Sequence, residues 1–92
     1  MMDRQNLLKL AIEAYGEGAQ RLMTVEECSE LIKALCKLPR GGSVADVVEE
    51  IADVQIMLDQ MKIIFGSDAV ELAEEKKLQR LENRLIGGLE ND

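Results

Sequence analysis

The chain has 92 residues, of which 47% are hydrophobic and only two are aromatic. This length predicts one domain. A chain this short buries only roughly 60–65% of its unfolded surface, so a single chain would be marginally stable. Part of the hydrophobic content therefore suits a subunit interface. The net charge of −7 argues against binding to a nucleic-acid polymer, because that affinity depends largely on Lys and Arg contacts to phosphate.

The first two predicted helices are separated by Gly16 and Gly18. Residues 4–15 form the first helix, which has one apolar side. Residues 19–38 form the second, and Pro39 stops it because proline lacks the backbone N–H and clashes with the preceding turn.

The last two predicted helices also end at glycines. The third begins after Ser43, its N-cap, and runs to Phe65, where Gly66 suits a left-handed terminator. The fourth begins after Ser67 or Asp68 and runs to Ile86, and Gly87 ends it, which leaves residues 89–92 as a frayed acidic tail. No alternating strand pattern occurs, so the sequence predicts an all-α fold.

Several features predict a cytoplasmic location. Cys28 and Cys36 would lie about 12 Å apart on one helix, too far for a disulfide, so we expect two buried small hydrophobes in a reducing compartment. No signal-peptide pattern follows the N-terminus, and no apolar run approaches the ~20 residues that a membrane span needs. We therefore expect no membrane partner.

Two of the predicted helices direct a pair of carboxylates, spaced i and i+3, toward their apolar sides. At about 100° per residue, Glu27 lies within roughly 40° of four apolar residues of the second helix, and Glu30 lies at the edge of that arc. Glu50 lies in the same way within the arc of the third helix, with Asp53 at its edge. The two arcs comprise Met23, Cys28, Leu31, Ala34, Leu35 and Leu38, and Val47, Val54, Met57, Leu58, Met61 and Ile64.

Buried carboxylates are costly unless they are paired or bound to a metal. Lys33 can pair with Glu30, but no basic residue of either helix lies near Glu27 or Glu50. If the two helices pack antiparallel, the four carboxylates converge and form a first shell for Mg²⁺, with Mn²⁺ as an alternative. The chain has no histidine, so a metal site would consist of carboxylates. The alternative is that each acidic pair is simply solvated.

The acidic pattern resembles that of a known family. EECSE at residues 26–30, followed after 19 residues by EIAD at residues 50–53, resembles the EExxE…ExxD signature of the MazG-like, all-alpha nucleoside triphosphate pyrophosphohydrolases. The segments EECSELIKAL, EEIADVQIMLDQM and KLQRLENRL are similar to the family as well, over residues 7–85. The resemblance implies a single MazG-like domain over residues 1–92. It also implies a four-helix bundle completed by oligomerisation, as a homodimer or homotetramer.

The resemblance also implies a reaction. Family members are Mg²⁺-dependent hydrolases that cleave the bond between the α and β phosphates of nucleoside triphosphates, releasing a monophosphate and pyrophosphate. By position, Glu27, Glu30, Glu50 and Asp53 would be the metal ligands. Glu26 would be the catalytic carboxylate that orients or deprotonates the attacking water. Phosphoryl transfer of this kind needs mainly positioning and charge neutralisation.

The predicted fourth helix carries a group of cations. Lys77, Arg80 and Arg84 lie within about 60° of one another, beside a stripe of leucines. Relatives carry basic residues here that meet phosphates, so the resemblance makes these three the candidates for binding the substrate phosphates. The alternative is a solvated face whose cations pair with neighbouring glutamates.

Other functions stay open. Phosphoribosyl-ATP pyrophosphohydrolases carry a similar acidic motif, and a metal-dependent phosphohydrolase that releases orthophosphate fits the same acids. A non-catalytic helical oligomerisation module would use the acids in salt bridges. Only Tyr15 and Phe65 could stack on a base as aromatics, so nothing in the sequence indicates the preferred nucleotide.

Overall fold

The computed structural model describes residues 1–90, with side chains to residue 88, and its regular structure there is entirely helical. The elements are α1 (Arg4–Tyr15), α2 (Glu17–Lys37), a 3₁₀ turn η1 (Leu38–Arg40), α3 (Val44–Phe65) and α4 (Ser67–Glu90). The predicted all-α class is confirmed. In the part of the chain described, no helix combines the length and apolarity that a bilayer crossing requires.

The ends of α3 follow local chemistry. The Ser43 hydroxyl accepts a hydrogen bond from the backbone N–H of Asp46 at 3.2 Å, which is the N-cap that the sequence predicts. Gly66 ends the helix with a φ of 111° and donates its N–H to the carbonyl of Lys62 at 2.9 Å. Its positive φ was expected, although its ψ of 106° lies outside the left-handed helical region.

The observed α2 begins two residues before the predicted helix and ends one residue earlier, at Lys37, directly before the η1 turn that contains Pro39. The predicted end of the fourth helix was wrong. α4 continues through Gly87 to Glu90, so the expected tail is partly helical, and residues 91–92 lie outside the described residues. A glycine within a helix costs only about 1 kcal/mol relative to alanine. This cost alone does not end a helix, which ends at a glycine only where a C-cap structure forms there.

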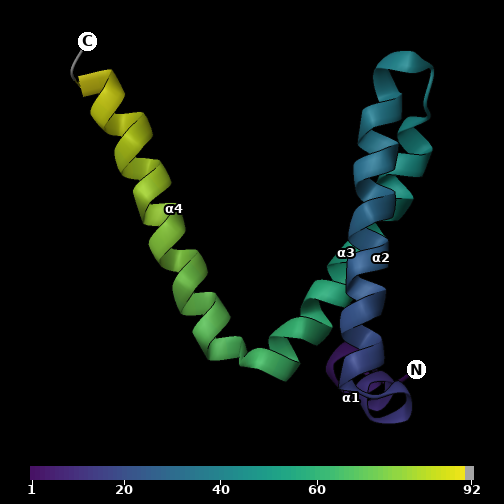
Figure 1. The fold of residues 1–92 in the computed structure, drawn as a ribbon. Coiled ribbons are helices and arrows are strands. Elements are labelled where there is room, and N and C mark those ends of the chain that lie inside the picture. The colour runs from purple at the N-terminus through teal and green to yellow at the C-terminus, as the bar shows by residue number, and fades with distance from the viewer. Residues whose placement is uncertain (91–92) are drawn as a thin grey trace.

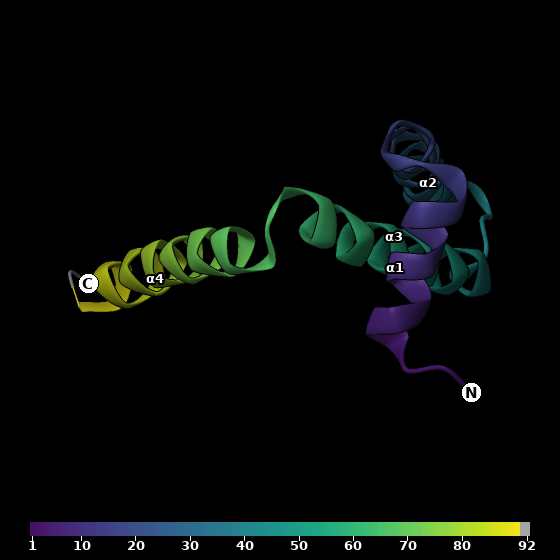
Figure 2. The same cartoon turned by 90° about the horizontal axis from the view of Figure 1, so that it is seen from below.

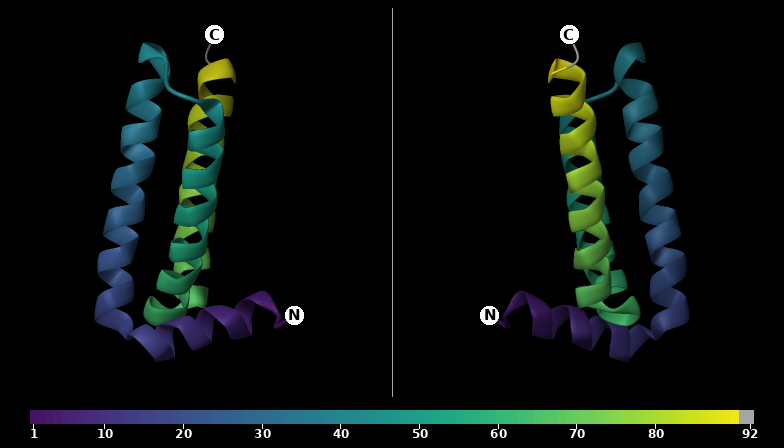
Figure 3. Two further views of the ribbon diagram at one scale, coloured as in Figure 1. Left: turned by 90° about the vertical axis from the view of Figure 1, so that its right-hand side faces the viewer. Right: turned by 90° about the vertical axis from the view of Figure 1, so that its left-hand side faces the viewer.

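The α2–α3 hairpin is the centre of the molecule. The two helices lie side by side and antiparallel (Figure 1), and α1 crosses the end of the hairpin opposite η1 (Figure 3). The Arg4 guanidinium of α1 pairs with the Asp59 carboxylate of α3 at 2.7 Å. α1 is thereby held against α3.

The core is thin. Among residues 1–88, the buried apolar side chains are Leu8, Val47, Val54 and Met57. The last three belong to the arc predicted for α3. Other predicted core residues are exposed at 40–48%, namely Met23, Leu35 and Leu58. Cys28 is half-buried, but Cys36 is exposed, contrary to expectation. A two-helix hairpin covers one stripe of each helix, so the edges of both arcs stay open to solvent.

The fourth helix stands apart from the others. It contacts α3 near the bend at Gly66, where Lys62 pairs with Glu71 at 3.5 Å, and then diverges (Figures 1 and 2). None of its side chains to residue 88 is buried. The Cα radius of gyration is 17.0 Å, against about 12 Å for a compact domain of this length. One chain by itself therefore does not close a four-helix bundle.

Candidate metal centre

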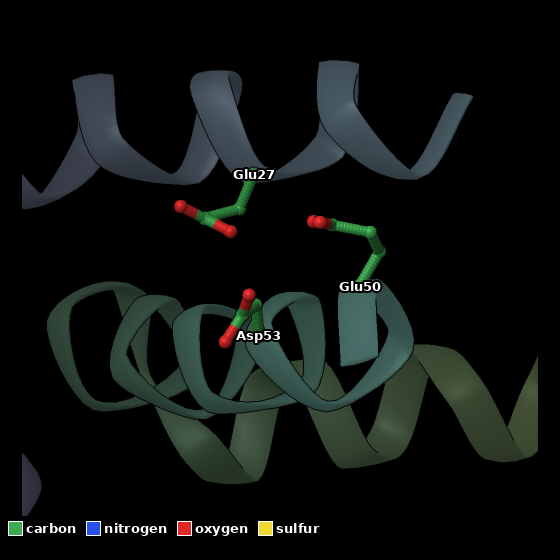
Figure 4. A group of neighbouring side chains, drawn as sticks. All are labelled: Glu27, Glu50 and Asp53. Atoms are coloured by element: carbon green, nitrogen blue, oxygen red, sulfur yellow. The ribbon is translucent and has the colours of Figure 1, made fainter. Parts of the chain in front are cut away.

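Three carboxylates converge between α2 and α3 (Figure 4). Glu27 comes from α2, whereas Glu50 and Asp53 come from α3, and one oxygen of each lies within 4.8 Å of the others. Oxygen ligands of one Mg²⁺ ion lie at most about 4.2 Å apart, because each lies about 2.1 Å from the ion. Small side-chain rotations would bring the three oxygens into one coordination sphere.

A glycine turn makes this convergence possible. Residues 38–43 reverse the chain, and the N–H of Gly42 donates to the carbonyl of Lys37 at 2.8 Å. A Cβ on Gly42 would lie 2.7 Å from the carbonyl carbon of Lys37, so only glycine fits at this approach. The i, i+3 spacing then places Glu50 and Asp53 on the face of α3 that is directed at α2.

The burial of Glu50 points to a missing partner. Its Oε2 atom is buried and has no hydrogen-bond partner among the described residues. Nor does any ion pair within residues 1–88 include Glu27, Glu50 or Asp53. An unpaired buried carboxylate oxygen is destabilising, and a divalent cation would satisfy it. Because all three donors are hard oxygen ligands, they fit Mg²⁺ or Mn²⁺.

The electrostatics of the cluster agree with that fit. Burial, followed by the charges of Asp53 and Glu50, raises the pKa of Glu27 above its usual range. Burial, followed by the charges of Asp53 and Glu30, raises the pKa of Glu50 in the same way. Both carboxylates therefore hold protons in the metal-free fold at a pH where they would be ionised in the unfolded chain.

This difference predicts a pH dependence for the metal-free protein. In the pH range from the unfolded glutamate pKa of about 4.3 up to the raised folded values, the native state binds more protons than the unfolded state. The cluster's contribution to the free energy of unfolding therefore falls as pH rises through that range. Urea denaturation in EDTA would measure the free energy of unfolding of the wild-type chain and of a Glu27→Gln/Glu50→Gln double variant across this pH range. The difference between the two isolates the contribution of the cluster. A difference that grows in favour of the wild-type chain with rising pH would contradict it.

The other two predicted site carboxylates lie outside this group of three. Glu30 is exposed and pairs with Lys33 at 3.4 Å, as the sequence allowed, but it lines the same pocket as Glu50. Glu26 is exposed on α2, next to Glu27. Glu30 is thus within reach of a ligand beside Glu50.

The three predicted phosphate-binding cations do not meet the cluster within one chain. Lys77, Arg80 and Arg84 are exposed on α4, which diverges from the hairpin (Figure 1). No ion pair in the described part of the chain includes them, so the pairing with neighbouring glutamates that the alternative expects is not formed there.

The sequence analysis missed two buried residues that lie about two helical turns from this site, between the same two helices. Gln20 and Gln60 are hydrogen-bonded between α2 and α3 and are 6% and 3% exposed. A signal was present, because Gln20 lies seven residues before Glu27 and therefore on the same side of the helix.

Comparison with known proteins adds no relative. No protein-family model matches the chain, and neither the curated proteins nor the solved structures contain a match. The fold and the site define an all-helical protein with a carboxylate cluster suited to a hard divalent cation.

Proposed function

We propose that this protein is a Mg²⁺-dependent nucleoside triphosphate pyrophosphohydrolase that works as a homo-oligomer. The convergence of Glu27, Glu50 and Asp53, with a buried unpartnered oxygen on Glu50, is the observation that carries the proposal. The same three residues occupy acidic positions of the EExxE…ExxD pattern. The side-chain geometry therefore brings together three of the four residues that the motif resemblance makes metal ligands.

The residues can be given roles in the hydrolysis. Water attacks the α-phosphorus, the bond from that phosphorus to the αβ-bridging oxygen breaks, and pyrophosphate leaves with the electron pair. Glu27, Glu50 and Asp53, with Glu30 completing the set, would hold a divalent cation, which when bound would supply charge neutralisation for the triphosphate. Glu26 is our candidate for accepting the proton of the attacking water, because it is exposed and adjacent to Glu27.

The exposed surface supports oligomerisation. The chain exposes 7187 Å², whereas a compact monomer of 10.2 kDa exposes about 5,300 Å². The excess of about 1,900 Å² per chain is in the range that obligate dimers bury. The exposed surface includes an apolar row on α4, where Leu72, Leu78, Leu81 and Leu85 are 44–60% exposed. A second copy of the chain would complete the bundle by covering this face.

The same arrangement gives the cations of α4 a role. Lys77, Arg80 and Arg84 lie beside the exposed leucines and, in one chain, away from the carboxylates. We infer that α4 of one copy packs near the hairpin of another, so that its cations face a carboxylate cluster that forms no ion pair within residues 1–88 of its own chain. Positive side chains at that position would hold the triphosphate through charge-assisted hydrogen bonds.

The proposed function is tested by a hydrolysis screen over common and modified nucleoside triphosphates with Mg²⁺ or Mn²⁺. Products are separated by ion exchange. Monophosphate with pyrophosphate is the expected result, and diphosphate with orthophosphate would reveal a phosphohydrolase of different regiochemistry. Turnover of phosphoribosyl-ATP alone would assign the site to that reaction.

A non-catalytic oligomerisation module is the second candidate. The exposed apolar face of α4 favours it, because that face needs a partner whether or not the acids bind metal. This candidate predicts no turnover of any nucleotide and no effect of Mg²⁺ on the melting temperature.

A further inference from the structure

A hydrogen-bonded pair of glutamines lies in the interface between α2 and α3. The Nε2 atom of Gln20 donates to Oε1 of Gln60 at 2.6 Å, and Nε2 of Gln60 contacts the sulfur of Met57 at 3.9 Å. Gln20 is 6% exposed and Gln60 is 3% exposed. The proposed reaction uses neither residue. Buried amides contribute little net stability, so the placement of this pair calls for another explanation.

The pair shares its register with the carboxylate cluster. Glu27 lies seven residues after Gln20 in α2, and Asp53 lies seven residues before Gln60 in α3. Seven residues make about two helical turns, so each step returns to nearly the same face and advances about 10.5 Å. Because the helices are antiparallel, any register that pairs Gln20 with Gln60 also places Glu27 opposite Asp53.

Apolar packing specifies this register poorly. Among residues 1–88, the buried apolar residues of α3 are Val47, Val54 and Met57, and α2 buries only Gln20, so few buried apolar side chains fix the register. The carboxylates themselves repel one another, which favours registers that separate them. A slip of either helix would leave the two glutamine amides buried without partners, and that penalty selects one register, as a buried polar residue does in coiled coils.

We propose that the Gln20–Gln60 hydrogen bond sets the register of α2 against α3 and thereby holds Glu27 opposite Asp53. Both glutamines are positioning residues, because they act through the two helices and do not belong to the cluster. The inference rests on the proposed function only for the role of the cluster, since the register can be measured without metal.

The test removes the amides but keeps the packing. In the Gln20→Met/Gln60→Met variant, both partners become apolar chains of similar length, so neither amide is left unpaired. Spin labels at Ile32 and Val48, which are 61% and 59% exposed, report the distance between the helices after both cysteines are replaced by alanine. Labelled chains are diluted with unlabelled chains so that only distances within one chain are seen.

Mn²⁺ affinity supplies the second measurement, and Leu8→Ala is the matched control. Leu8 is 5% exposed and belongs to α1, so its truncation destabilises the fold while leaving the sequences of α2 and α3 unchanged. The control should lower the melting temperature and leave the label distance and the Mn²⁺ affinity of the folded protein unchanged. The glutamine variant should keep its melting temperature, broaden the distance distribution and weaken Mn²⁺ binding by about tenfold or more.

Each outcome decides the proposal. A distance distribution identical to that of the wild-type labelled chain would overturn the register role, and an unchanged Mn²⁺ affinity beside a broadened distribution would overturn the positioning role. Should the wild-type chain fail to bind Mn²⁺, the proposed metal site fails, while the label distances still decide whether the glutamines set the register.

Discussion

Replacing Glu50 with glutamine should lower Mg²⁺-dependent turnover by more than 100-fold while leaving the helical signal in circular dichroism intact. Glu50 supplies the buried oxygen that has no partner among the described residues. A lost metal ligand should cost more than the roughly 10–100-fold effect typical of outer-shell partners. Since the charge of Glu50 adds to the repulsion at Glu27, the metal-free variant should melt at a higher temperature than the wild-type chain.

The matched control for this prediction is Glu49→Gln. Glu49 is the adjacent acid of α3, is exposed and lies outside the group of three carboxylates. The Glu49→Gln variant should retain turnover and should still be stabilised by Mg²⁺. This stabilisation is about 2.7 kcal/mol at a Mg²⁺ concentration about 100-fold above the dissociation constant. Equal loss in both variants would mean that general negative charge, and not coordination by Glu50, supports the activity.

Helix existence could be predicted from the sequence because its signals are local. The Ser43 cap and the breakers at Gly16, Pro39 and Gly66 act within a few residues, and the structure places helix ends at or beside them. Gly87 shows the limit of that reasoning, because glycine weakens a helix without ending it.

Convergence of the cluster was predictable because helical periodicity places Glu27, Glu50 and Asp53 on facing sides. What periodicity could not give was the depth of burial. The apolar arcs predict a closed core, but Leu35 and Leu58 are 48% and 45% exposed in one chain. An apolar side signals only that something covers it, and the sequence pattern does not distinguish a helix of the same chain from one of another copy.

Substitution of Leu81 by glutamate in α4 should convert the proposed homo-oligomer to single chains in solution. Leu81 is 44% exposed within a row of exposed leucines, and an interface that covers it would lose this apolar contact and bury an unpaired carboxylate in its place, which costs more than the lost apolar area. A two-fold interface contains the substitution twice, so the dissociation constant should rise by at least about 100-fold. Sedimentation velocity would measure it, with Gln79→Glu on the opposite side of α4 as the control of equal charge.

Mixing two inactive variants decides whether the cations of α4 serve the cluster of another copy. In a dimer of Glu50→Gln with Arg80→Ala, one site carries both defects and the other carries none if the contribution comes from the partner. Freely exchanging chains should then recover about one quarter of wild-type turnover, because half of the dimers are mixed and each has one intact site. If each α4 serves its own cluster, every mixed site keeps one defect and no activity returns. Loss of turnover in Leu81→Glu together with recovery on mixing would mean that the catalytic site forms only in the oligomer. It would also mean that α4 contributes side chains to that site in addition to packing.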